Sequence, residues 1–260
     1  MSPAVRRLLL GAAGLAGGIL CWTLIQRLFA LSPYILPSPW SMVRALGTGF
    51  AIADADENWM PLVANTFGSG LAGWIAGGLA GVATGALLIA CRPVESLFRP
   101  WIGLFGGLTS VAASPLVLYW SGFGTGSKLL LAAWLAFFPV VRATLAGLRA
   151  APAAWHDVMR GFSASGWETF LRLRLPAALP GLCGAMRRAW TLALVGVLIA
   201  EFLGAPGGLG GQISHHEAAF DLAGAIAGLI VLAVVGTAVA GALQWAEGGV
   251  TDWVGLPRRA

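Results

Sequence analysis

The chain has 260 residues, of which 58% are hydrophobic and only 10% are charged, and its formal net charge is +5. Soluble domains contain about 25% charged residues and disordered chains have low hydrophobicity, so both classes are excluded. The composition indicates an integral membrane protein, and the basic residues are not interleaved with the polar surface that would bind nucleic acid.

Six apolar stretches are long enough to cross a bilayer as helices. A crossing needs about 20 mostly apolar residues, and a helix satisfies every backbone polar group within lipid. The stretches are also far too long for barrel strands. They predict an all-α membrane protein with one transmembrane domain over residues 1–260 and spans at about 8–31, 62–91, 101–120, 129–149, 179–202 and 220–246.

The first stretch follows Arg6 and Arg7, as the apolar part of a secretory signal would. A signal has an apolar part of about 7–15 residues, whereas this stretch extends to about residue 31 and five more follow. It is therefore predicted to be a retained helix. Cys21, Cys91 and Cys183 lie in or beside apolar stretches without metal-binding spacing, and are predicted to be packing residues.

The basic residues predict the orientation of the six spans. If both termini are cytoplasmic, thirteen of the sixteen basic residues lie inside or near the inner ends, and only Arg27, Arg44 and Lys128 lie outside. This agrees with the positive-inside rule. The opposite loops carry acidic residues instead, namely Asp54, Asp56, Glu57, Glu201, Glu217 and Asp221.

Small residues form a stripe on the second span. The spacing of four places Gly73, Gly77, Gly81 and Gly85 on one helix face, where a neighbouring backbone can approach closely. The stripe can serve packing within the chain or a contact between subunits, and the spacing favours the first. Gly224 and Gly228 repeat the pattern more weakly in the last span.

The third span contains Thr109, Ser110 and Ser114, which are candidates for lining a pathway because the rest of the stretch is apolar. The following "GFGTGSK" (122–128) is similar to a phosphate-binding loop, but that motif requires Gly-Lys followed by Ser or Thr. We therefore interpret it as a flexible turn.

The segment between the fourth and fifth spans predicts two short amphipathic helices. The first begins after Pro152, and its apolar face at i, i+3, i+4 and i+7 is Trp155, Val158, Met159 and Phe162, with His156, Asp157 and Arg160 turned away. Ser165 and Glu168 form an S-x-x-E capping box that starts the second helix, whose apolar face is Trp167, Phe170 and Leu171. Pro176 and Pro180 predict a turn into the fifth span. Such helices either lie on the bilayer surface or fill a groove on a partner.

Three polar groups near the fifth span are further candidates. Arg187 and Arg188 lie within its apolar run; they either reach the cytoplasmic interface or face a pathway for anions. Glu201 closes the span and is a candidate for gating or anchoring the outer mouth; the alternative is that it caps the end of the helix. The nearby His215 and His216 lack metal-binding spacing, and no metal site is predicted.

The segment "DVMRGFSASGWETFLRLRLP" (157–176) resembles the EAA loop of permease subunits of bacterial binding-protein-dependent ABC importers. Leu175 and Pro176 match the family's Leu-Pro, while Asp157, Val158, Met159, Ser163 and Leu173 stand at its Glu, two Ala, Gly and Ile positions. The stretches "LPSPWSMVRAL", "VESLFRP", "SPLVLYWSGFGTGSK", "LPAALPGLCGAMRRAW" and "AEFLGAPGGLG" also resemble nitrate, sulfonate and taurine permeases, so the likeness covers about 33–246.

The resemblance implies a type I importer fold, with residues 152–174 as a coupling loop. It implies a non-catalytic subunit of the bacterial inner membrane that forms a homodimer and binds two ATPase subunits through the coupling loop. ATP and Mg²⁺ are then expected on the ATPase subunits and no cofactor on this chain, and an extracytoplasmic binding protein is expected to deliver the substrate. The expected substrate is a small anion such as a sulfonate, taurine or nitrate, and the alternatives are a vitamin precursor or an aromatic compound. An ion-coupled secondary transporter and a membrane enzyme are disfavoured, because no acidic residue lies mid-span and no catalytic set converges.

Overall fold

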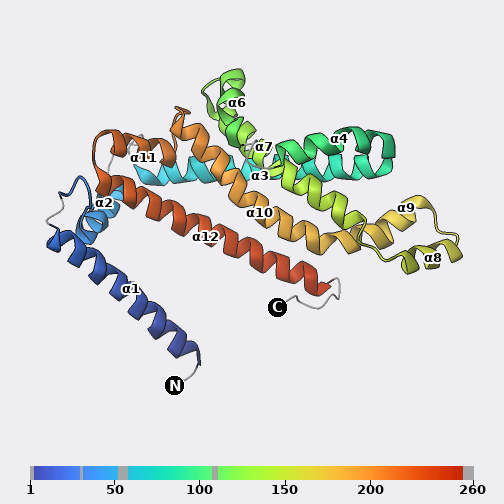
Figure 1. The fold of residues 1–260 in the computed structure, drawn as a ribbon, viewed down its shortest axis with the longest axis horizontal. Helices are drawn as coiled ribbons and strands as arrows, with labels where there is room; N and C mark the ends of the chain where they lie inside the picture. The colour runs from blue at the N-terminus through green and yellow to red at the C-terminus, as the bar shows by residue number, and fades with distance from the viewer. Residues whose placement is uncertain (1–2, 30–31, 52–57, 107–110, 254–260) are drawn as a thin grey trace. The chain divides into compact units, whose positions relative to one another are not determined.

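The computed structural model describes residues 3–29, 32–51, 58–106 and 111–253, and the regular structure in these ranges is helical (Figure 1). The helices are α1 (Pro3–Leu28), α2 (Pro39–Ala51), α3 (Trp59–Ala90), α4 (Arg92–Phe105), α6 (Ser114–Ser121), α7 (Thr125–Leu148), α8 (Ala153–Gly161), α9 (Gly166–Thr169), the π-helix η1 (Phe170–Arg174), α10 (Leu175–Phe202), α11 (Leu209–Ala218) and α12 (Leu222–Trp253). The chain divides into two compact units, one of residues 1–62 and 212–232 and one of residues 63–211 and 233–260.

In the first unit, α1 holds the segment that leads into α2. The indole of Trp22 donates to the carbonyl of Pro37 at 2.9 Å, and the amide of Gln26 donates to the carbonyl of Leu36 at 3.0 Å. The hydroxyl of Ser38 then accepts from the backbone N–H of Ser41, which caps the N-terminus of α2. Together these bonds fix the direction of α2 relative to the segment that precedes it.

In the second unit, α7 is the central helix and packs along α10 (Figure 1). Small and branched side chains of both helices are fully buried at this contact: Ala132, Ala136, Val140, Ala189, Ala193 and Val197. Gly196 brings the two backbones together, because a side chain there would lie 2.7 Å from the carbonyl oxygen of Leu131. Close backbone approach is the kind of contact that stabilises helix pairs in lipid.

The glycine stripe of α3 also packs against α7. A Cβ at Gly81 would lie 2.9 Å from the carbonyl oxygen of Phe137, and one at Gly77 would overlap the backbone of Ala133. Gly73 and Gly85 face Ala132 and Thr144 in the same way. The interpretation of the stripe as packing within the chain is therefore confirmed for these four positions.

Four helical stretches among the described residues are long and apolar enough to cross a membrane, namely 59–90, 125–148, 166–202 and 222–248. The expected span at 101–120 is not one continuous helix, because α4 ends at Phe105 and α6 begins only at Ser114. Gly106 forms the C-cap of α4, and Pro115 lies in the first turn of α6, where its missing N–H is tolerated. Residues 107–110 lie outside the described residues.

Candidate functional site

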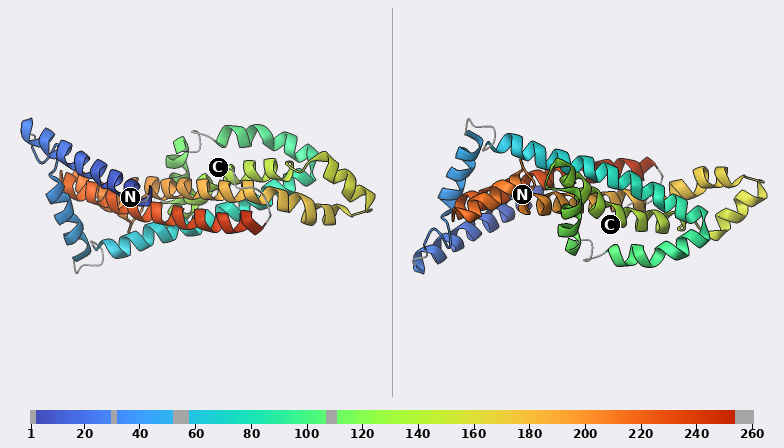
Figure 2. Two further views of the ribbon diagram at one scale, coloured as in Figure 1. Left: turned by 90° about the horizontal axis from the view of Figure 1, so that it is seen from below. Right: turned by 90° about the horizontal axis from the view of Figure 1, so that it is seen from above.

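Two short helices, α8 and α9, stand together at one end of α7 and α10 in both views of Figure 2. Pro152 is the N-cap of α8, so the chain leaves α7 and turns within four residues. The predicted helix pair in the segment 152–174 is therefore confirmed.

The turn between α8 and α9 requires a left-handed residue, and that residue is Ser163. Its φ is +53°, its N–H donates to the carbonyl of Arg160, and the next N–H, of Ala164, donates to the carbonyl of Met159. This is a Schellman motif, which usually places glycine at the left-handed position. Ser163 is thus the position where the resemblance expects glycine, and serine adopts the same conformation there.

The predicted capping box starts α9. The hydroxyl of Ser165 accepts from the N–H of Glu168 at 3.2 Å, and the carboxylate of Glu168 accepts from the N–H of Ser165 at 2.9 Å. These reciprocal bonds satisfy donors that a helix start leaves open. They fix the direction of α9 relative to the turn that precedes it.

Most of the apolar side chains of the two helices are exposed in the chain, whereas Met159 and Phe170 are half-buried. Phe162 is 81% exposed, Trp167 68% and Trp155 61%, and the adjacent Val158 and Leu171 are also exposed. Trp167 stacks on Phe170 with ring centroids 5.7 Å apart. Apolar side chains exposed to this extent are covered either by the bilayer surface or by a groove on a partner protein. We call Trp155, Val158, Phe162, Trp167 and Leu171 the docking face.

Charged residues accompany the docking face but do not cover it. Asp157 and Arg160 form an exposed ion pair at 3.6 Å within α8. At the start of α8, the guanidinium of Arg149 forms an ion pair with Glu95 on α4. Since Arg149 is the C-cap of α7, this pair ties α4 to the point where the chain enters α8.

The predicted turn into the fifth span is wrong, because α9 continues through η1 into α10 without a break. Leu175 and Pro176 begin α10, and Pro180 lies inside it. A proline ring clashes with the carbonyl four residues before it, and the wider π-helical turn of η1 comes at that distance before Pro176. Trp167 and Leu171 of the docking face are therefore joined to α10 by continuous helix.

The structure distributes the predicted pathway residues over several environments. Thr109 and Ser110 lie outside the described residues, and Ser114 is fully buried at the start of α6. The guanidinium of Arg187 lies 3.6 Å from the carboxylate of Glu247 on α12, whereas Arg188 is exposed. The assignment of these residues to a pathway stays a prediction.

Glu201, the remaining predicted pathway residue, is fully buried in an ion pair with Lys128 at 2.9 Å. The hydroxyl of Thr66 donates to the same carboxylate. The segment 122–128 was expected to be a flexible turn, but Thr125–Lys128 is the first turn of α7. Sequence reasoning missed Lys128 and Thr66. The available signal was a single lysine at the start of an apolar run, because a charge in that place is costly without a partner.

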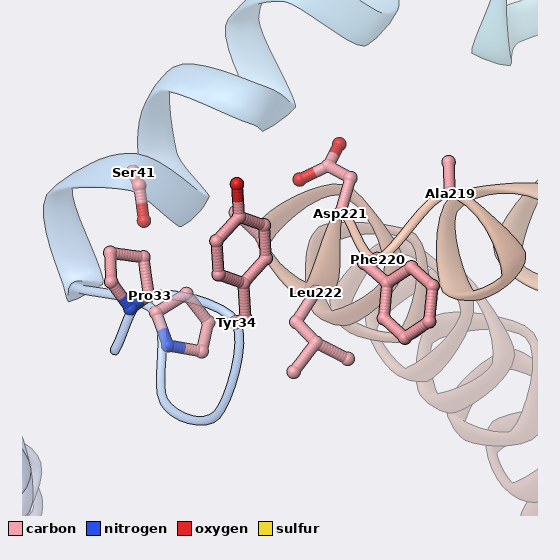
Figure 3. Close-up of a pocket in the computed structure, with 9 residues that line it drawn as sticks. Pro33, Tyr34, Ser41, Ala219, Phe220, Asp221 and Leu222 are labelled. Carbon is pink, nitrogen blue, oxygen red and sulfur yellow. The ribbon is translucent and has the colours of Figure 1, made fainter. Parts of the chain in front are cut away.

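A separate pocket of about 390 Å³ lies in the first unit (Figure 3). Pro33, Tyr34 and Ser41 lie on one side, and Phe220, Asp221 and Leu222 lie on the other. Asp221 accepts from the N–H of Gly224 and lies 2.9 Å from Nδ1 of His216. No sequence motif indicated this pocket.

Comparison with known proteins decides the family. The model of the family described as "Binding-protein-dependent transport system inner membrane component" matches residues 73–251, which is more than half of the chain. The chain belongs to this family. It is a multi-pass protein of the inner membrane and an ABC transporter permease.

Several relatives match over most of their length. A probable ABC transporter permease protein of Haemophilus influenzae is 28% identical over 87% of this chain and 90% of its own. The putative aliphatic sulfonates transport permease protein SsuC of Bacillus subtilis is 28% identical over 90% and 84% of the two chains. The taurine transport system permease protein TauC of Escherichia coli is 26% identical over 97% and 92%.

The permease also shares its fold with a solved transporter. A chain of the MetNI methionine ABC transporter, in an inward-facing conformation, superposes with a TM-score of 0.53 over 83% of this chain and 97% of that chain, at 19% sequence identity. The predicted type I importer fold is therefore confirmed. The family implies ATP-binding subunits and a substrate-binding protein as partners of the permease.

Proposed function

We propose that this permease is the non-catalytic membrane subunit of an ATP-driven importer, and that two copies of it form the translocation pathway. Two ATPase subunits, which bind ATP and Mg²⁺, dock on the docking face in the cytoplasm. Both termini lie on the same side, as the distribution of basic residues indicates. An extracytoplasmic binding protein delivers the substrate to the opposite side.

The observation that carries this proposal is the docking face itself. Its large side chains are between 43% and 81% exposed, on helices whose ends are held by a Schellman motif and a capping box. A rigid amphipathic helix that presents apolar anchors fits a groove on a partner protein. The same face would bury Phe162 at the centre of such a groove, where aromatic residues contribute most to binding.

The continuous helix from α9 to α10 supports a lever mechanism. When ATP closes the ATPase pair, the bound α8 and α9 move with it, and η1 transmits that motion to α10. The ion pair between Glu95 and Arg149 transmits the same motion to α4. Since α10 packs along α7 over most of its length, the displacement reorganises the membrane helices and switches the side to which the pathway opens.

The names of the relatives support one substrate class over another. Two of them are named for aliphatic sulfonates and one for taurine, so we assign this permease to a small sulfonate-like anion. Other relatives are named for formylaminopyrimidine and riboflavin, which makes a vitamin precursor the alternative. Measuring the binding of both compound classes to the cognate binding protein distinguishes these two assignments.

The test is affinity purification of the tagged permease from its native membrane in mild detergent, followed by identification of the proteins that copurify. We expect an ATPase subunit at about one copy per permease in the wild type. Phe162→Glu places a charge in the groove, and we expect it to lose most of the ATPase, because an unpaired buried charge costs several kcal/mol.

Phe123→Ala is the matched control, because Phe123 is another exposed phenylalanine, at the opposite end of α7 from α8. This variant keeps the ATPase if the docking face is the contact. Equal recovery with Phe162→Glu and Phe123→Ala contradicts the assignment of the docking face. Uptake by the permease alone, without ATP, contradicts the importer.

A further inference from the structure

A buried polar network joins three parts of the second unit at the end of α7 that is distant from α8. The Nζ atom of Lys128 on α7 lies 2.9 Å from Oε1 of Glu201, which is near the end of α10. The hydroxyl of Thr66 on α3 donates to Oε1 at 2.9 Å and to Oε2 at 3.1 Å. Both ionised side chains have an exposed fraction of 0%.

The network also holds the glycine-rich segment 203–210. The backbone N–H of Gly210 donates to Oε2 of Glu201 at 2.8 Å, and that of Leu209 donates to the hydroxyl of Thr66 at 2.9 Å. The carbonyl of Gly207 accepts from Lys128 at 3.1 Å. These bonds satisfy the first N–H groups of α11 and place a carboxylate at its positive N-terminus.

Glycine at position 208 is what lets this segment approach the carboxylate. A Cβ there would overlap the side-chain carboxyl of Glu201, and one at Gly210 would lie 2.8 Å from its Oε2. The motif "GAPGGLGG" (204–211) therefore has a specific partner within the chain. It is a segment shaped to cover an ion pair.

An ion pair of this kind resists separation. Removal of one member leaves the other charge buried without its counter-ion, which costs far more than the loss of an exposed ion pair. Two further acceptors of Lys128 are neutral, namely the Gly207 carbonyl at 3.1 Å and the Asn65 side-chain oxygen at 3.5 Å, so neither can replace Glu201 as a counter-ion.

We infer that Lys128, Glu201 and Thr66 are positioning residues that lock the segment 203–210 to α3 and α7, so that this corner of the permease moves as one rigid body during transport. The pathway then opens by displacement of this whole body, and the segment does not swing away from α3 and α7 as a separate gate. This assignment replaces a pathway-lining role for Glu201 with a mechanical one.

The test is hydrogen exchange of the backbone amides of residues 203–211 in the purified permease. In Glu201→Gln we expect exchange about a hundredfold faster than in the wild type, because the bonds from Gly210 and Lys128 weaken together. Thr66→Val is the milder variant: it removes the acceptor for Leu209 but keeps the ion pair, and we expect an increase of about tenfold. Thr84→Val, the same change on the same helix outside the network, is the control and leaves exchange unchanged.

If residues 203–211 exchange as slowly in Glu201→Gln and in Thr66→Val as they do in the control Thr84→Val, the inference is overturned. A Glu201→Gln chain that does not fold leaves Thr66→Val and its control to decide. These measurements need only the permease, so their outcome does not depend on the proposed function.

A second measurement rests on the proposed function and uses the complex of wild-type permease and ATPase, with and without ATP and vanadate. We expect exchange of residues 203–211 to stay within about twofold between the two states, because a rigid body keeps its internal bonds. An increase of more than about tenfold on trapping would show that the segment opens as a gate, and would overturn the inference. If no ATPase copurifies, the proposed function is contradicted, but the inference about residues 203–210 is not.

Discussion

Replacing Gly77 by alanine tests the close contact between α3 and α7. The new Cβ would lie 2.9 Å from both the Cα and the carbonyl carbon of Ala133, whereas carbon atoms in good contact are about 3.5–4.0 Å apart. Because these atoms belong to a backbone, no side-chain rotation can relieve the overlap, and the two helices must separate. Overpacking of this kind costs about 1–3 kcal/mol.

Gly68 provides the matched control on the same helix, because a Cβ there would meet nothing within 4 Å. Alanine is favoured over glycine in a helix by about 1 kcal/mol, so Gly68→Ala should be neutral or stabilising. Gly77→Ala gains the same term but loses more to overlap, and we expect a net loss of about 1–2 kcal/mol.

The assay is unfolding of both variants in mild detergent by titration with a denaturing detergent, with the loss of helix monitored by circular dichroism. We expect the midpoints of the two variants to move in opposite directions from the wild type, or Gly68→Ala to stay in place while Gly77→Ala falls. Equal shifts in the same direction would refute the argument that the α3 stripe packs on the backbone of α7.

Two further changes test local features of the same unit. Ser163 has a left-handed conformation, which costs an L-residue about 1–2 kcal/mol and costs glycine nothing. We therefore expect slower amide exchange of residues 153–165 in Ser163→Gly and faster exchange in Ser163→Val. The reverse order would contradict the Schellman turn. Trp74→Phe removes the indole bond to the carbonyl of Met186 at 2.8 Å, and we expect the unfolding midpoint to fall by the equivalent of about 1–2 kcal/mol; an unchanged midpoint would mean that this bond contributes nothing.

The segment between α7 and α10 was predictable because its signals are local. The period of the apolar residues in α8, the position of Pro152 and the pair Ser165 and Glu168 all act within one or two helical turns. The resemblance around Leu175 and Pro176 predicts that the same segment docks on an ATPase, and this assignment stays a prediction. Local interactions of this type are the same in the isolated sequence and in the folded chain.

The predicted turn at Pro176 failed for a reason that is also physical. A proline usually ends or bends a helix, and the sequence contains nothing that indicates a π-helical turn before it. In the structure η1 accommodates the ring, so α9, η1 and α10 form one helix. The difference matters for function, since a turn would separate Trp167 and Leu171 of the docking face from α10, whereas a continuous helix connects them.

Composition and patterning by themselves determined that this chain is a helical membrane protein, where most of its helices lie and which segment is exposed as an amphipathic pair. These properties follow from hydrophobicity and from interactions between residues close in sequence. Only the tertiary structure decided that Lys128 meets Glu201, 73 residues away, and that the α3 glycines contact α7. Such contacts depend on which helix faces pack together, and a single sequence does not contain that choice in any local pattern.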